Sequence, residues 1–76
     1  MNKERRKRIE EVKEQLEVLQ GEIEDIQSEE EDYMYNMPEN LQESDKYYKA
    51  ESAVEAMSSA IDSISEACNS LDEAME

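Results

Sequence analysis

The chain has 76 residues, of which 37% are hydrophobic and 39% charged, and its net charge is −14. This length accommodates one small domain, and so few apolar side chains cannot enclose a large core, so we expect stabilisation by partner chains. A single cysteine excludes an intramolecular disulfide framework, and no stretch is long and apolar enough for a transmembrane helix.

The charge is unevenly distributed along the chain. Residues 1–13 hold six of the eight basic residues against three acidic ones, which gives a side-chain charge of +3. The remainder holds 19 acidic residues and only two basic ones, hence −17. The basic start leads into further charged residues and not into an apolar signal segment, so we expect a cytoplasmic protein. The acidic body favours basic protein surfaces and disfavours direct binding to nucleic acid or membranes.

The first predicted helix spans about residues 3–34, because apolar residues recur there at alternating spacings of three and four. This heptad seam consists of Ile9, Val12, Leu16, Leu19, Ile23, Ile26 and Tyr33. Glu30 interrupts the seam, and we interpret it as a solvated residue near one end of the fold and not as a buried ligand. Gly21 falls opposite the seam, where its cost of about 1 kcal/mol is tolerated.

A turn is predicted over residues 35–44, around the only proline, Pro38. Asn40 and Glu43 have the spacing of a capping box, while Ser44 and Asp45 are alternative caps. The second helix therefore starts somewhere between residues 38 and 45, and the sequence leaves the choice open.

The second predicted helix covers about residues 45–75, again with a heptad seam. Its members are Tyr47, Ala50, Val54, Met57, Ile61, Ile64, Cys68, Leu71 and Met75. Cys68 is on this seam, so we expect a buried thiol. The two helices match in length, which predicts an all-α fold, an antiparallel helical hairpin. Basic residues 3–8 would then lie beside Asp72, Glu73 and Glu76.

A ladder of small residues runs beside this second seam. Its members, also spaced three and four apart, are Ala53, Ala56, Ala60, Ser63, Ala67, Ser70 and Ala74. Helix propensity alone is one explanation, since alanine is the best helix former. We favour a second contact surface, an oligomer interface that joins hairpins into a four-helix bundle or a larger homo-oligomer. The ladder does not fix the relative direction of the second helices.

The usual ingredients of catalysis are absent from the sequence. It contains no histidine and a single glycine, and no nucleophile has a neighbouring base. The acidic run 29–32 lacks the ligand pattern of a calcium loop and is interpreted as a solvated face. We therefore expect a non-enzymatic protein without a cofactor or metal site.

All four tyrosines flank the predicted turn. Tyr33 and Tyr47 are on the seams and are expected to close the hairpin core, whereas Tyr35 and Tyr48 are off the seams and suit an outward contact. If hairpins pack head to tail, the basic end of one chain meets the turn of the next. The candidate binding residues are then Arg5, Arg6, Arg8, Tyr35, Lys46, Tyr48 and Lys49. Arginine binds phosphates and tyrosine stacks on bases, so a small nucleotide is one possible ligand of this composite site.

The acidic body suggests an alternative function. Its charge per unit length, doubled in a dimer, is similar to that of duplex DNA, so the protein is also a candidate DNA mimic that blocks a nucleic-acid-binding protein. An acidic helical surface also serves simple solubility.

The turn segment Asn36-Met37-Pro38-Glu39-Asn40-Leu41-Gln42-Glu43-Ser44 lies between a Glu/Lys-rich helix and an Ala/Ser/Glu/Asp-rich helix. In this it resembles short acidic helical proteins encoded by phages and prophages of Gram-positive bacteria. The resemblance implies a phage accessory or anti-defence factor in the host cytoplasm. Such a binding or inhibitor protein would sequester a host immune component, either a protein or a small nucleotide signal. A structural coiled-coil or assembly factor is a further alternative.

Overall fold

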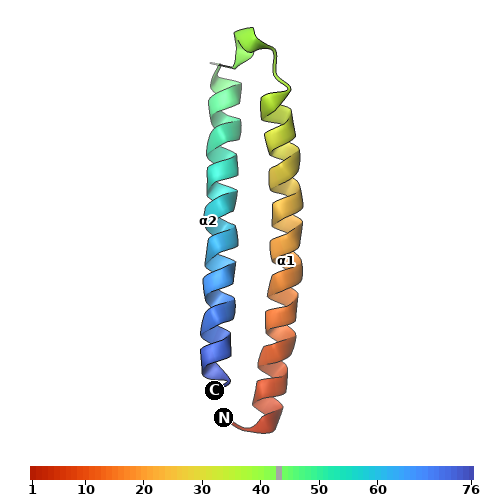
Figure 1. Cartoon of the computed structure of the whole chain (residues 1–76), viewed down its shortest axis with the longest axis vertical. Coiled ribbons are helices and arrows are strands. Elements are labelled where there is room, and N and C mark those ends of the chain that lie inside the picture. The colour runs from red at the N-terminus through yellow and green to blue at the C-terminus, as the bar shows by residue number, and fades with distance from the viewer. Residues whose placement is uncertain (43) are drawn as a thin grey trace.

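The computed structural model describes residues 1–42 and 44–76. Helix α1 (Lys3–Tyr35) and helix α2 (Asp45–Ala74) are joined through a short 3₁₀ helix, η1 (Glu39–Leu41). The two long helices run antiparallel and side by side, with the turn at one end and both termini at the other (Figure 1). The Cα trace extends 59 Å by 15 Å by 12 Å. The all-helical hairpin predicted from the seams is confirmed.

Each long helix begins at a side-chain cap. The Asn2 side-chain oxygen accepts a hydrogen bond from the Arg5 backbone N–H at 2.8 Å. The Ser44 hydroxyl accepts one from the Tyr47 backbone N–H at 3.4 Å, so Ser44 is the cap among the alternatives left open by the sequence. Both caps satisfy backbone donors that have no partner inside the helix. Glu43, the other half of the expected capping box, lies outside the described residues.

The turn is organised around Pro38. Its backbone is extended, with φ −56° and ψ 147°, and it precedes η1 directly. The Pro38 carbonyl accepts a hydrogen bond from the Leu41 N–H at 2.8 Å. The Gln42 side-chain amide donates to the Met37 carbonyl at 3.3 Å. Since proline cannot continue α1 and suits the start of a new turn, it separates the two long helices.

The seam predicted for α2 is confirmed. Ala50 and Cys68 are buried, and the other seven members are half-buried against α1. The expected buried thiol of Cys68 is also confirmed. The sequence located this face correctly because apolar residues occupy it without interruption from Tyr47 to Met75.

The seam predicted for α1 is only half right. Ile9, Leu16 and Ile23 are half-buried, but the other four members are between 47% and 54% exposed. The four are Val12, Leu19, Ile26 and Tyr33. Half-buried polar side chains occur at 13, 20 and 27 instead, and Met34 is buried.

Tyr33 therefore corrects a specific expectation. It was predicted to close the hairpin core, but it is 51% exposed while Met34 is buried. α1 is turned so that the residue directly after each exposed apolar one takes the inward position. The inward polar residues Lys13, Gln20 and Gln27 make polar contacts with α2 that explain this rotation.

Candidate functional site

One edge of the hairpin is closed by side-chain hydrogen bonds between the helices. The Gln20 side-chain amide donates to the Ile61 carbonyl at 2.9 Å and to the Ser65 hydroxyl at 2.7 Å. Seven residues later, the Gln27 amide donates to the Val54 carbonyl at 3.0 Å and to the Ser58 hydroxyl at 2.6 Å. We call this the polar edge, formed by Lys13, Gln20, Gln27, Ser58, Ser65 and Asp72.

Lys13 continues the polar edge toward the chain termini. Its ammonium contacts the Asp72 carboxylate at 2.7 Å and is 3.9 Å from the Glu17 carboxylate. The hydrogen bond with Asp72 raises the pKa of Lys13, with desolvation acting in the opposite direction. This ion pair lies at a register consistent with the two glutamine contacts, so all three hold the same alignment of the helices.

The opposite edge of the hairpin is apolar and open. Val12, Leu19 and Ile26 each directly precede an inward polar residue. One residue corresponds to a rotation of about 100° around the helix axis, so these three side chains lie on the side of α1 that faces away from the polar edge. On α2, Ser58 and Ser65 follow seam residues, whereas Ala60 and Ala67 precede them. Since the serines meet the glutamines on the polar edge, the small ladder and the exposed apolar residues of α1 share the other edge. A groove lined by both Tyr33 and Lys46 agrees with this placement.

We call this surface the apolar edge. It is formed by Val12, Leu19, Ile26 and Tyr33 of α1 and by Ala53, Ala56, Ala60, Ser63, Ala67, Ser70 and Ala74 of α2. Ala53 is half-buried, and the other ten members are exposed. Within one hairpin, the predicted oligomer interface is thus an accessible surface, and its role in assembly stays a prediction.

The predicted binding residues fall into two groups at opposite ends of the hairpin. Arg5 and Arg8 line one groove near the termini with Val12. Tyr35, which is 66% exposed, Lys46, Tyr48 and Lys49 are at the turn end. A hairpin whose Cα trace extends 59 Å keeps the groups apart, so only contact between chains can combine them.

Two of these residues already have contacts within the chain. The Arg6 guanidinium donates to the Met75 carbonyl at 3.0 Å, at the C-terminus of α2, where a cation is favourable. The Tyr48 ring packs edge-on against Tyr47, with ring centroids 6.0 Å apart. The basic residues 3–8 were expected beside Asp72, Glu73 and Glu76. The observed cation on Asp72 is Lys13, and Arg6 binds a carbonyl.

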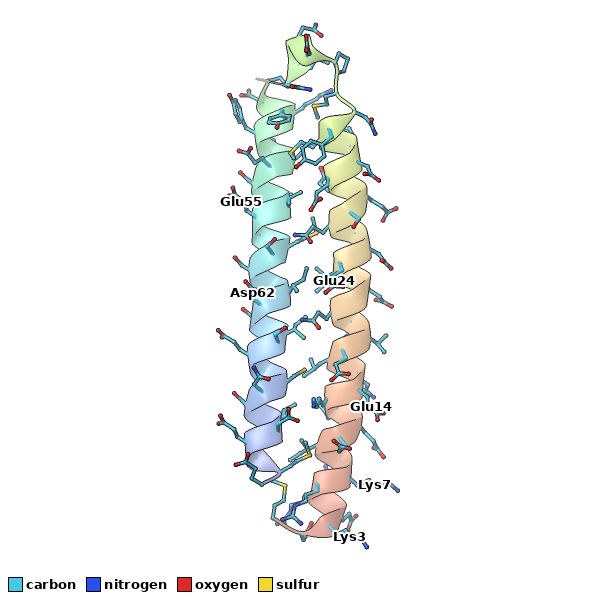
Figure 2. All side chains as sticks on the ribbon, viewed as in Figure 1. Lys3, Lys7, Glu14, Glu24, Glu55 and Asp62 are labelled. Carbon is cyan, nitrogen blue, oxygen red and sulfur yellow. The ribbon has the colours of Figure 1, made fainter. Side chains whose placement is uncertain are left out.

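Acidic side chains cover the outward surfaces of both helices. Figure 2 shows Glu14 on α1 and Glu55 and Asp62 on α2 projecting away from the opposite helix. Lys3 and Lys7 are at the end of α1 that carries the termini (Figure 2). Glu30, expected to be solvated, is half-buried.

The two glutamines are the structural residues that the sequence reasoning missed. They recur at intervals of seven with Lys13 and Met34, directly after the apolar residues that were assigned to the seam. That repeat was the available signal. A polar residue in a heptad pattern is usually assigned to the solvent side, although glutamine is long enough to reach a carbonyl across a helix pair.

Comparison of the chain with protein-family models, with curated proteins and with solved structures found no match. Over residues 1–42 and 44–76, no helix is long and apolar enough to cross a membrane. Within the same ranges, no three histidine, cysteine or acidic side chains gather as they would around a metal ion.

Proposed function

We propose that this chain is a non-enzymatic binding protein that assembles with copies of itself and sequesters a target molecule. The observation that carries the proposal is the contrast between a hairpin edge closed by hydrogen bonds and an edge of exposed Val, Leu, Ile and Tyr side chains. A row of exposed large apolar side chains along one edge favours an interaction site there.

The exposed area of the chain supports assembly. The hairpin exposes 5838 Å², whereas a compact monomer of 8.9 kDa exposes about 4,800 Å². Only Met34, Ala50 and Cys68 are buried apolar residues in the described part of the chain. Covering the apolar edge would supply the burial that one hairpin lacks.

The target is proposed to bind the surfaces that assembly leaves free. The acidic outer faces suit a basic protein, and the arginine and tyrosine groups at the two ends suit a nucleotide once neighbouring chains bring them together. The resemblance to phage-encoded hairpins favours a component of host immunity as this target.

Assembly is tested by placing charge on the small ladder. Ala60→Glu together with Ala67→Glu should dissociate the assembly, because buried unpaired carboxylates are costly. Light scattering reports the mass and circular dichroism the helical content, which should stay largely intact. Ser59→Glu with Asn69→Glu adds the same charge outside the ladder and should leave the mass unchanged. An unchanged mass for the ladder variant contradicts the proposal.

Sequestration is tested by native mass spectrometry of protein purified gently from its host. We expect multiples of the chain mass together with a retained target, and a bare monomer contradicts the proposal. Tyr35→Ala with Tyr48→Ala should weaken retention of a nucleotide. Full biological activity of that double variant without any retained target would indicate a purely structural assembly factor.

The outward carboxylates favour one second candidate, a DNA mimic. A net charge of −14 over 59 Å is about one charge per 4 Å, and two hairpins side by side carry about one per 2 Å, against about one per 1.7 Å in duplex DNA. A mimic competes with DNA for its target, and added salt weakens its binding steeply. Target binding that is indifferent to both DNA and salt excludes this candidate.

A further inference from the structure

The apolar edge of α1 belongs to a longer seam that does not face α2. Its members, spaced three and four apart, are Arg5, Arg8, Val12, Gln15, Leu19, Glu22, Ile26, Glu29 and Tyr33. All nine are exposed. Two shallow grooves follow it, one lined by Arg5, Arg8 and Val12 and the next by Gln15, Val18 and Leu19. We call it the outer seam.

The outer seam is self-complementary when read in both directions from Leu19. Val12 and Ile26 are at equal distances on either side, and so are Arg5 and Tyr33. Arg8 and Glu29 are at nearly equal distances, with opposite charges. In an isologous interface residue i contacts j while j contacts i, which this order satisfies for an antiparallel copy.

We infer that a second copy of this chain covers the apolar edge in the antiparallel direction, on a twofold axis that passes by Leu19. Helix α1 then packs on α1 of the second copy, and α2 packs on its α2. Arg8 of each copy meets Glu29 of the other, and Arg5 meets the ring of Tyr33, a favourable cation–π pairing.

The small ladder of α2 has its centre at the same level. Gln20 bonds to residues 61 and 65, so its neighbour Leu19 is level with a residue between these two. The middle residue of the ladder is Ser63. One twofold axis therefore relates the outer seam of α1 to its own copy and the small ladder of α2 to its own copy. This axis sets Ala60 of one copy against Ala67 of the other. Short side chains at this contact permit a close approach of the two α2 helices.

Charge selects this direction over a head-to-head packing. Residues 29–51, at the turn end, hold eight acidic and two basic side chains, a net −6. Residues 1–13 and 66–76, at the terminal end, hold seven acidic and six basic side chains, a net −1. Head-to-head packing would place the two −6 ends together. The antiparallel arrangement places each beside the nearly neutral end and brings Lys46 and Lys49 toward Glu73 and Glu76 of the second copy.

The surface has the size that a specific dimer needs. A face of 59 Å by 15 Å in the Cα trace has an area of about 900 Å², against about 800 Å² per partner in a standard interface. The inference rests on the proposed assembly and adds its stoichiometry, direction and axis.

Two substitutions test the dimer and its seam. We expect the wild-type chain to have twice its formula mass by light scattering. Leu19→Glu should weaken dimerisation at least about tenfold while helical content is retained. Ser28→Glu is the matched control, because Ser28 is exposed, lines neither groove and directly follows Gln27 of the polar edge; this variant should remain dimeric. A monomeric wild-type chain, or a Leu19→Glu variant that dimerises normally, overturns both this inference and the proposed assembly.

A cysteine pair tests the direction separately. In a Cys68→Ala background, Ser63→Cys should form a disulfide-linked dimer on mild oxidation, because the axis brings the two copies of residue 63 together. Ser59→Cys, off the ladder, should not. A dimer of normal mass in which Ser63→Cys fails to cross-link overturns the antiparallel axis alone, and then head-to-head packing or a different partner helix covers the edge. Failure of an intact dimer to retain any target overturns the proposed sequestration and leaves the axis standing.

Discussion

The two edges of the hairpin flank the same pair of seams but differ in what fills them. On the polar edge, Gln20 and Gln27 reach across to carbonyl and hydroxyl oxygens of α2. On the apolar edge, Leu19 and Ile26 are about half exposed. Apolar contact is non-directional, so either side of α1 would have served as its inner face on hydrophobicity alone. The glutamine hydrogen bonds have a direction, and they fix the rotation of α1.

This rotation has a cost that the proposed assembly would offset. Each interhelical hydrogen bond adds about 0.5–1.5 kcal/mol net, whereas leaving a Leu or Ile side chain exposed forgoes about 1.5–3 kcal/mol of burial. A hairpin that turns glutamine inward and leucine outward is therefore best stabilised when another surface covers the outward side chains. The comparison of the two edges thus leads to the proposed dimer.

The largest expected difference is between two isoleucines of α1. In the Leu19→Glu background, where the apolar edge stays uncovered, Ile23→Ala should cost about 2 kcal/mol of unfolding free energy, because Ile23 packs against α2. Ile26→Ala should cost less than about 0.5 kcal/mol, as a surface substitution does. Urea denaturation measures both values. Equal losses would show that the two edges are not distinct in the single hairpin.

The next effect concerns the glutamines. Gln20→Ala should lower the unfolding free energy by about 1 kcal/mol, since it removes two interhelical hydrogen bonds. Gln20→Leu with Gln27→Leu should recover this stability but remove the directional contacts, so that α1 samples more than one rotation. Doubled or broadened backbone amide signals in NMR spectra would report it. A single sharp set of signals would mean that packing alone fixes the rotation.

The cap of α2 should contribute a similar or smaller amount. Ser44→Ala is expected to cost about 1 kcal/mol because the Tyr47 N–H loses its acceptor. Ser52→Ala, inside the same helix, is the control and should be neutral or slightly stabilising. Thermal unfolding of both variants checks the difference. Ser44 is a member of neither edge, so the loss of its hydroxyl should leave the dimer mass unchanged.

The smallest effect is expected at Lys13. Its pKa is raised by Asp72, so the stabilisation is fully present below the ordinary pKa of 10.5 and is lost as the pH rises through the raised value. Lys13→Met should lower the melting temperature slightly at neutral pH and low salt, but not above the raised pKa. Lys7→Met, at an exposed position of the same helix, is the control. A difference between Lys13→Met and wild type that persists unchanged at high pH would contradict the ion-pair explanation.

Much of the hairpin follows from local signals. The helix bounds were predicted at 3–34 and 45–75 and are Lys3–Tyr35 and Asp45–Ala74, because apolar periodicity and the single proline act over short distances. Ser44 was one of several possible caps, and only the structure selects it. The spacing of the small residues from Ala53 to Ala74 predicts a contact surface, but their position beside Leu19 and Ile26 depends on how α1 is rotated.

By itself, the sequence determined two long helices, their lengths, the turn and the inner face of α2. These properties depend on helix propensity, capping and an uninterrupted seam, which are all determined by residues close to one another in the sequence. The tertiary structure decided which half of the α1 seam faces inward. It also decided that the exposed apolar residues of α1 and the small ladder of α2 share one edge. The reason is physical: the heptad pattern of α1 offers two nearly equivalent apolar faces. Hydrogen bonds between residues more than 25 positions apart choose between them.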